Sequence, residues 1–148
     1  MLYGQYPQTS LKKKVNLRSA LSVYSRVIYL KSIKKGRTIS YGRTFVAPKD
    51  MTVATIPIGY SDGYPRILSN KSSVLIDGCS CPVLGRVTMD QIVVDVSNVI
   101  GVELGARVTI LGEDKGERIT SDQLASFAQT ISYEILCNLG NRLPRVYS

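Results

Sequence analysis

An Asp-Gly pair separates two short apolar runs in the stretch Ser73-Val74-Leu75-Ile76-Asp77-Gly78-Cys79-Ser80-Cys81-Pro82-Val83-Leu84. Two-residue hairpin turns favour Asp-Gly, because both turn positions need a positive φ that these residues adopt at low cost. The stretch therefore predicts an antiparallel hairpin with strands over 73–76 and 81–84.

Similar strand-like runs lie on both sides of this hairpin, and Gly- or Pro-bearing turns separate them. They cover residues 21–33, 39–46, 51–58, 91–96 and 107–111. The run 51–58 is almost continuously apolar, which indicates burial on both faces. Short strands at this spacing indicate a closed barrel or a sandwich. We expect a mainly β fold, specifically a closed Greek-key-like β-barrel.

The end of the chain changes to a helical period. Apolar residues recur at i, i+3, i+4 and i+7 within 124–131, which predicts an amphipathic helix. Thr120 and Gln123 form a capping-box pattern before it. A second helical turn is predicted over 133–139 with Ser132 as its cap. The barrel should therefore end in a short helical segment.

The 148 residues suffice for one domain with a hydrophobic core, since 44% are hydrophobic and 20% charged. No apolar run approaches the roughly 20 residues that a membrane-spanning helix needs. The amino terminus shows no signal-peptide pattern, so we expect a cytoplasmic protein. Residues 1–18 have no clear period and are interpreted as an interdomain lead-in, with the barrel domain over 19–148.

Positive charge is concentrated in the first fifty residues, where eleven Lys or Arg face the single acid Asp50. Such asymmetry is typical of a nucleic-acid surface, of a solvated face, or of an interface with an acidic domain. Tyr24 and Tyr29 lie in this region, but they fall among strand-like apolar residues and are expected to pack. Nucleic-acid binding is therefore the less favoured interpretation.

Cysteine and histidine content restricts the available chemistry. The three cysteines, Cys79, Cys81 and Cys137, are expected to be reduced. Cys79 and Cys81 are two apart on one strand and poorly placed to bond each other. Histidine is absent, which removes the usual general base and most zinc sites, so no metal site is expected. Acid–base chemistry must use Tyr, Lys, Asp, Glu or Cys.

Two glycine-bounded segments contain the candidate functional residues. They are Gly59-Tyr60-Ser61-Asp62-Gly63-Tyr64-Pro65-Arg66 and Gly85-Arg86-Val87-Thr88-Met89-Asp90-Gln91. The first follows an apolar run, so its glycine-hinged turn can present the Tyr60 hydroxyl at a mouth or interface. Taken alone, it reads as a surface loop with an exposed tyrosine. Taken alone, the second offers a core methionine and a turn aspartate.

Together, and in this order, the two segments resemble the C-terminal domain of the alanine racemases, which are fold-type III pyridoxal-phosphate enzymes. A third match is Ile131-Ser132-Tyr133-Glu134-Ile135-Leu136-Cys137. The ending Arg142-Leu143-Pro144-Arg145-Val146-Tyr147 is similar to the family's terminal segment, and we assign it no chemistry. The start Met1-Leu2-Tyr3-Gly4 resembles the segment that joins the family's two domains. The resemblance thus spans nearly the whole chain.

The resemblance implies a role for four residues. Tyr60 corresponds to the catalytic acid/base that exchanges the α-proton on the L-face of the substrate. Met89 binds the substrate carboxylate through its backbone N–H, and Asp90 adjoins the same site. Tyr133 donates its hydroxyl to the cofactor phosphate. Asp62 and Arg66 are expected to hold the loop in shape rather than to react.

The family further implies interconversion of L- and D-alanine for cell-wall peptidoglycan, with pyridoxal 5'-phosphate as cofactor. The Schiff-base lysine belongs to an N-terminal (β/α)8 domain that is absent here, and none of this chain's lysines lies in its motif. The expected partners are that domain and a second subunit, because the family's active site lies at a homodimer interface. The chain alone is therefore expected to be inactive.

Three alternatives stay open. A serine or broad-range amino-acid racemase would use the same scaffold, since substrate choice depends on pocket walls outside this chain. A stand-alone basic β-barrel that binds nucleic acid belongs to a different class, and so does a non-catalytic dimerisation module. Related decarboxylases lack the Gly-Arg-x-x-Met-Asp-Gln pattern and fit less well.

Overall fold

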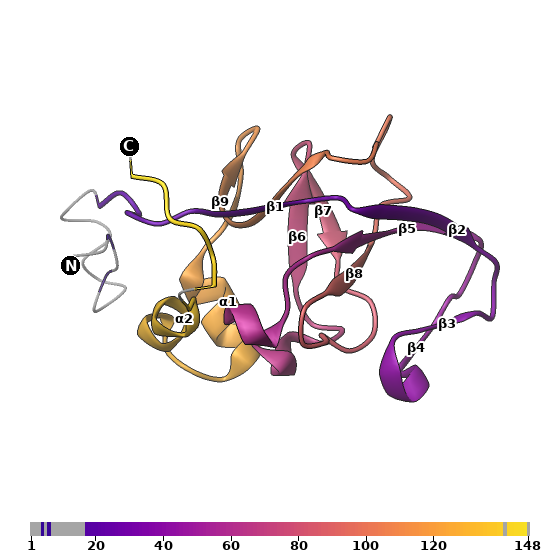
Figure 1. Ribbon diagram of the computed structural model, residues 1–148, viewed down its shortest axis with the longest axis horizontal. Coiled ribbons are helices and arrows are strands. Elements are labelled where there is room, and N and C mark those ends of the chain that lie inside the picture. The colour runs from indigo at the N-terminus through magenta and orange to yellow at the C-terminus, as the bar shows by residue number, and fades with distance from the viewer. Residues whose placement is uncertain (1–3, 5, 7–16, 141, 148) are drawn as a thin grey trace.

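The computed structural model describes residues 4, 6, 17–140 and 142–147. In that part the chain is mainly β and ends in two short helices, which confirms the predicted fold class (Figure 1). The strands are β1 (Val23–Arg26), β2 (Tyr29–Ile33), β3 (Thr38–Ile39), β4 (Phe45–Val46), β5 (Met51–Ile56), β6 (Ser73–Ile76), β7 (Cys79–Pro82), β8 (Ile92–Asp95), β9 (Arg107–Asp114) and β10 (Glu117–Ile119). The helices are α1 (Ser121–Ala128) and α2 (Ser132–Asn138), and the 3₁₀ turns are η2 (Tyr41–Arg43), η3 (Tyr60–Asp62) and η4 (Arg66–Leu68). The predicted lead-in over 1–18 lies largely outside the described residues.

The strands pair in three antiparallel sheets. The largest has the order β1–β9–β6–β7, with β10 also paired to β9. A second sheet has the order β2–β5–β8, and β3 pairs with β4 in a small ribbon. Val83 and Val94 form an isolated bridge that joins the β7 side of the first sheet to β8 of the second. The late strand β9 thus lies between the early strands β1 and β6.

The two larger sheets also share one extended stretch of chain, in which β1 leads directly into β2 (indigo in Figure 1). At the junction, the Val27 N–H donates to Ala106 O at 3.0 Å, on the β9 side. The next amide, that of Ile28, donates to Thr55 O at 3.0 Å, on the β5 side. The sheets are therefore connected on both sides, as a barrel requires, and full closure of the barrel stays a prediction.

One large apolar core lies inside this arrangement. Val74, Val94 and Val108 are completely buried within it, and burying each such side chain stabilises the fold by about 1.5–3 kcal/mol. Helices α1 and α2 pack against the same core through Leu124 and Ile135. A second, smaller core lies around the β3–β4 ribbon and consists of Ile39, Ala47, Met51, Val53 and Leu84.

The predicted hairpin is present as β6 and β7. Ile76 pairs with Cys79, so Asp77 and Gly78 form a two-residue turn with φ of 54° and 77°. Both φ values are positive, as the Asp-Gly preference requires. The Gly78 N–H also donates to Asp114 Oδ2 at 2.9 Å. The second strand begins at Cys79, two residues earlier than predicted.

The three cysteines are free thiols, as predicted. Cys81 is buried, Cys79 is partly buried and Cys137 is exposed. Burial raises the pKa of Cys81 to about 12, with smaller contributions from the nearby Cys79 and Asp95. Because the thiolate is the nucleophile, Cys81 is unreactive near neutral pH.

Two strand predictions were wrong in their extent. Residues 39–46 do not form one strand, because Gly42 (φ 70°) and Arg43 (φ 51°) reverse the chain between β3 and β4. Strand β9 continues to Asp114, and β10 was missed because Gly112 was interpreted as a turn residue. Gly112 instead allows close packing, since a Cβ there would lie 2.8 Å from Ser22 Oγ.

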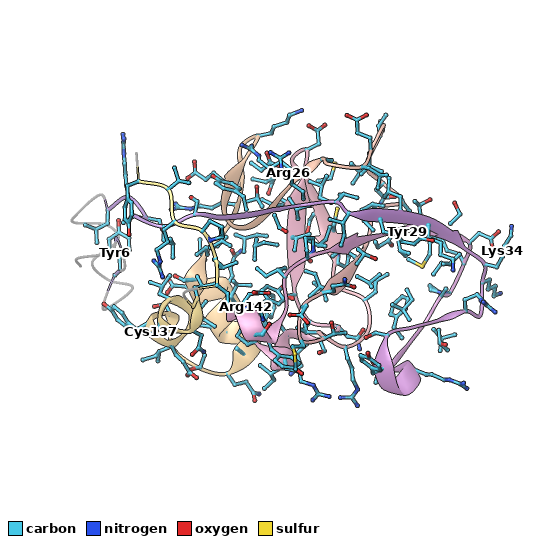
Figure 2. The ribbon with its side chains drawn as sticks, viewed as in Figure 1. Tyr6, Arg26, Tyr29, Lys34, Cys137 and Arg142 are labelled. Carbon is cyan, nitrogen blue, oxygen red and sulfur yellow. The ribbon has the colours of Figure 1, made fainter. Side chains whose placement is uncertain are left out.

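Tyr24 and Tyr29 do not pack inside, which corrects the prediction for these two residues. They are 49% and 55% exposed on the outer face of β1 and β2. The Arg107 guanidinium lies 5.1 Å from the centre of the Tyr24 ring. Figure 2 shows Tyr29 and Lys34 along the long β1–β2 segment, far from Arg142 and Cys137.

The capping box at the start of α1 is confirmed. The Thr120 N–H donates to Gln123 Oε1 at 2.8 Å, and the Gln123 N–H donates to Thr120 Oγ1 at 3.1 Å. Helix α2 is shifted by one residue from its prediction, because Ile131 rather than Ser132 is its extended cap. None of the described helices is long and apolar enough to cross a membrane.

Candidate active site

The segment Gly59–Arg66, here named the tyrosine loop, follows β5 and begins with the 3₁₀ turn η3. The Gly59 N–H donates to Asp62 Oδ2 at 2.9 Å, so a carboxylate closes the start of the turn. Asp62 is only 8% exposed. Gly63 then adopts φ 97°, and its N–H donates a hydrogen bond to Tyr60 O. The loop shape thus depends on Asp62, as the sequence predicted.

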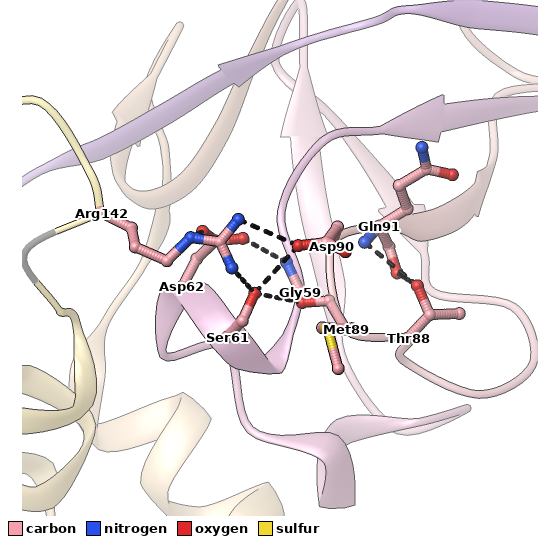
Figure 3. Close-up of polar contacts among 8 residues, drawn as sticks. All are labelled: Gly59, Ser61, Asp62, Thr88, Met89, Asp90, Gln91 and Arg142. Carbon is pink, nitrogen blue, oxygen red and sulfur yellow. Dashed lines mark hydrogen bonds and ion pairs between the residues drawn. The ribbon is translucent and has the colours of Figure 1, made fainter.

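The segment Gly85–Gln91, here named the methionine loop, forms a tight turn before β8. The Thr88 N–H donates to Gln91 O at 3.0 Å, and the Thr88 hydroxyl lies 2.9 Å from the same oxygen. The Gln91 N–H donates back to Thr88 Oγ1 at 3.1 Å. These bonds close the turn at Thr88 and Gln91 and leave Met89 and Asp90 at its tip (Figure 3).

The two loops are joined backbone to backbone. The Tyr60 N–H donates to Thr88 O at 3.0 Å, and the Ser61 N–H donates to Met89 O at 3.0 Å. Gly59 permits this approach, since a Cβ at position 59 would lie 2.3 Å from Met89 O. The structure therefore brings together Tyr60, Met89 and Asp90, which are separated in the sequence.

The bond from Tyr60 to Thr88 also orients the peptide that carries the Met89 N–H. In a trans peptide the C=O and N–H groups point in opposite directions. Because the Thr88 carbonyl faces the Tyr60 amide, the Met89 N–H faces away from the tyrosine-loop backbone. Within the described part of the chain, this N–H meets no acceptor, so it is available to a ligand.

The exposed side chains of the site differ in their contacts. Tyr60 is 42% exposed, and its hydroxyl has no hydrogen-bond partner among the described residues. Met89 is 53% exposed. The Asp90 carboxylate is engaged instead, because its Oδ1 lies 3.1 Å from the Ser61 hydroxyl and 3.0 Å from Arg142 Nη2. Tyr60 is thus the free acid/base candidate.

Arg142 is the residue of this site that sequence reasoning missed. Its guanidinium contacts Asp90, lies 3.5 Å from Asp62 Oδ1 through Nε, and donates to the Ser61 hydroxyl. Figure 3 shows it spanning the side of the two loops. The predicted loop-shaping residue Arg66 is exposed, and no described contact of its guanidinium supports that role. The cation that contacts the loop comes from the tail of the chain.

Tyr133 lies in helix α2 and makes no described hydrogen bond to either loop. It occupies the first turn of α2 and is 39% exposed, and the structure gives its hydroxyl no partner in the described residues. The other end of α2 does reach the tyrosine loop. A Cβ on Gly63 would lie 1.8 Å from Asn138 O, and the Gly140 N–H donates to Asp62 O at 3.3 Å. The chain at the C-terminal end of α2 therefore packs against the tyrosine loop, and Tyr133 lies at the other end of the same helix.

Tyr64, four residues after Tyr60, has the opposite environment. It is 1% exposed, and its hydroxyl lies 2.7 Å from Ser72 Oγ. Burial raises the pKa of Tyr64 to about 12, although the Ser72 hydroxyl acts in the other direction. Tyr64 anchors the loop and stays protonated. In the described residues, no group of three or more acidic or cysteine side chains is arranged to hold a metal ion.

Comparison with known proteins assigns the scaffold. Residues 20–147 match the family model described as alanine racemase, C-terminal domain. The chain is 44% identical over 146 residues to alanine racemase 2 of Caldanaerobacter subterraneus subsp. tengcongensis, and this match covers 99% of the chain but 38% of the relative. The chain thus spans less than two fifths of the curated relative.

Solved structures agree with this assignment. The crystal structure of alanine racemase from E. faecalis superposes with a TM-score of 0.93 at 36% identity, over 99% of this chain and 39% of that one. The alanine racemase from Bartonella henselae, with covalently bound pyridoxal phosphate, gives 0.85 at 32% identity, over 99% and 40%. This chain therefore belongs to the alanine racemase C-terminal domain family.

Proposed function

We propose that this chain is the C-terminal domain of a pyridoxal-phosphate-dependent alanine racemase, and that Tyr60 is its acid/base on the L-face of alanine. The observation that carries the proposal is the Tyr60–Met89 arrangement. An exposed phenol with a free hydroxyl is fixed through its own amide to the peptide whose N–H is open to a ligand.

The open N–H of Met89 would bind the substrate carboxylate. A hydrogen bond to a charged acceptor is stronger than one between neutral groups, so one oriented amide contributes usefully to binding. Asp90 adjoins this position, but its carboxylate is held by Ser61 and Arg142. We therefore assign Asp90 to the border of the substrate site, where its negative charge is partly compensated.

A phenol that exchanges protons near neutral pH needs a nearby positive charge, because its ordinary pKa is about 10. Arg142, which contacts the tyrosine loop, already faces two carboxylates. We therefore expect the positive charge beside Tyr60 to come from the preceding domain, which would cover the exposed side of the loop.

Tyr133 is the residue of this chain that would hold the cofactor, by donating its free hydroxyl to the phosphate. Its partial exposure and lack of a partner fit that role. Pyridoxal phosphate, when bound, withdraws electron density from the α-carbon. The cofactor lysine would belong to an N-terminal (β/α)8 domain, which the length of the relatives leaves room for.

We further propose a homodimer in which Tyr60 of one subunit reaches the cofactor domain of the other. This agrees with a site that is open on one side in the described chain. A cytoplasmic location is supported by the three free thiols, since disulfides are rare in that compartment. The product, D-alanine, would supply peptidoglycan.

The test is a reconstituted enzyme in which this chain is fused behind the part of E. faecalis alanine racemase that precedes the matched region. We expect the fusion to racemise alanine and the chain alone to show no turnover. Removing an acid/base group typically costs about 100-fold or more. Tyr60→Phe should therefore lower racemisation by that amount, whereas Tyr29→Phe, an exposed tyrosine on β2, should not.

Isotope exchange distinguishes the two faces. In deuterated water, Tyr60→Phe should block loss of the α-proton from L-alanine while D-alanine still exchanges. Equal exchange of both enantiomers would remove Tyr60 from the mechanism. An inactive fusion, or turnover by the chain alone, would contradict the proposal that the enzyme needs both this chain and a preceding cofactor domain.

A further inference from the structure

We propose that Arg142 is a positioning residue for this reaction, which holds the tyrosine loop and the methionine loop in the register that Tyr60 and Met89 need. The inference rests on the proposed function for its kinetic consequence. The contact itself rests on the geometry alone.

The guanidinium contacts both loops at once. Its Nη2 donates to Asp90 Oδ1 at 3.0 Å, at the tip of the methionine loop. Its Nε lies 3.5 Å from Asp62 Oδ1, and Nη1 donates to the Ser61 hydroxyl, both in the tyrosine loop. A planar guanidinium has several donors in a fixed fork, so three acceptors on two loops define its position and theirs.

Ser61 extends the contact to the peptide that follows Met89. Its hydroxyl oxygen accepts from Arg142, and its single proton has two acceptors in reach, Met89 O at 2.7 Å and Asp90 Oδ1 at 3.1 Å, of which Met89 O is the nearer. The same carbonyl accepts the Ser61 N–H at 3.0 Å. Such chains of hydrogen bonds strengthen one another. Arg142 therefore acts on the backbone on the C-terminal side of Met89, while Tyr60 acts on the peptide before it.

The charges give Arg142 a second effect at the same place. Asp90 adjoins the position proposed for the substrate carboxylate, and Asp62 puts a second carboxylate within 3.5 Å of the same guanidinium. Like charges repel, and Arg142 is the cation that contacts both. Replacing it with a neutral side chain would leave Asp62, which has an 11% exposed side chain, with less compensation.

If Arg142 served only the stability of the fold, its replacement would lower the thermal midpoint and leave kcat unchanged. The side chains of Arg142 and Asp90 are each 56% exposed, and exposed ion pairs contribute little to stability. Loss of the Asp90 contact should therefore barely change the thermal midpoint, and the nearly buried Asp62 should account for most of any fall. A misplacement of about 1 Å at a reacting group, by contrast, can lower the rate by about 100-fold.

The experiment compares Arg142→Gln with Arg145→Gln in the reconstituted enzyme. Arg145 lies on the same tail, and among the described residues its guanidinium donates to Leu139 O alone, at 3.2 Å, so it is the matched control. Two measurements are made: steady-state racemisation, and hydrogen exchange of the peptides that contain the Tyr60 and Ser61 amides. Arg142→Lys and the pair Arg142→Gln with Asp90→Asn complete the set.

For Arg142→Gln we expect kcat to fall by about 10- to 100-fold with a small change in KM. The Tyr60 and Ser61 amides should exchange faster, and the thermal midpoint should move by no more than about 3 °C. Arg142→Lys should recover part of the rate, and Asp90→Asn should reduce the loss by removing the uncompensated charge. Arg145→Gln should behave as the wild type.

Normal kcat in Arg142→Gln, or an equal loss in Arg145→Gln, would overturn the proposal. If the wild-type fusion does not racemise alanine, the proposed function fails, and exchange of the Tyr60 and Ser61 amides then decides alone whether Arg142 holds the loops. Unchanged exchange in Arg142→Gln would overturn the inference in that case as well.

Discussion

The β6–β7 hairpin and the pair of site loops both reverse the chain between strands, and both contain a glycine that the geometry requires. In the hairpin, Gly78 adopts φ 77° at the second position of a two-residue turn between β6 and β7. At the site, Gly59 has φ −147°, which any residue adopts, and its role is to let Met89 O approach. Local conformation thus requires the first glycine, and a contact between distant segments requires the second.

Alanine substitutions at the two glycines should give the largest difference between the site and the hairpin. Gly59→Ala places a Cβ 2.3 Å from Met89 O, a backbone atom that cannot yield without separating the loops. We expect a loss of about 2–3 kcal/mol of stability and of about 100-fold in racemisation by the reconstituted enzyme.

Gly78→Ala is the control for that experiment. A Cβ there lies 3.0 Å from a Lys115 side-chain atom, and the positive φ adds about 1 kcal/mol of strain. We expect a modest fall in the thermal midpoint with unchanged kcat. Normal activity in Gly59→Ala would show that the loops do not depend on their close approach.

Alkaline pH tests the buried anchor of the tyrosine loop. Tyr64 has a pKa of about 12 in the folded chain and about 10 when unfolded. Its contribution is therefore fully present below pH 10, and the unfolded state gains from ionisation above it. Stability should fall by about 2 kcal/mol as pH rises from 10 to 12.

Tyr64→Phe should remove that part of the pH dependence, at a cost of about 1 kcal/mol near neutral pH for the lost bond to Ser72. Chemical denaturation of both proteins at pH 8, 10 and about 11 would measure it. Parallel curves for the two proteins across this range would contradict a buried, protonated Tyr64.

A smaller change in stability is expected from a substitution at Thr109, in the largest sheet. It lies at the centre of β9 and is fully buried, and its hydroxyl is the buried side-chain polar atom without a partner in the described residues. Thr109→Val keeps the shape and removes the unsatisfied group. We expect a gain of about 1 kcal/mol, measured by denaturant unfolding. A loss would show that the hydroxyl has a partner, such as a bound water.

The smallest expected effect concerns a purely local contact. Thr120→Ala removes the side-chain acceptor of the capping box at α1 and should cost about 1 kcal/mol or less. The Thr120 side chain bonds within its own helix start and to neither site loop, so kcat should stay unchanged. A large fall in kcat would show that the helices transmit strain to the site.

The same contrast explains what the sequence predicted and what it did not. The Asp77-Gly78 turn and the Thr120–Gln123 capping box are encoded by neighbouring residues, and both were predicted. Tyr60 and Met89 were proposed as site residues through the resemblance of the motifs around them, and their roles stay a prediction. Arg142 was missed because it lies 81 residues from Ser61 and 52 from Asp90. No local pattern encodes such a contact, and Arg66 was assigned its loop-shaping role through the resemblance of the segment Gly59–Arg66.

The bond between the Tyr60 amide and Thr88 O has a consequence for substrate size. Tyr60 supplies the phenol, and its amide also orients the peptide that carries the Met89 N–H. The distance between the phenol and this N–H is therefore fixed by the two loops. Under the proposed function, an amino acid with a larger side chain would present the same carboxylate and α-carbon to these two groups as alanine does. Selection for a new substrate would therefore act on walls contributed by other parts of the enzyme and leave these two loops unchanged.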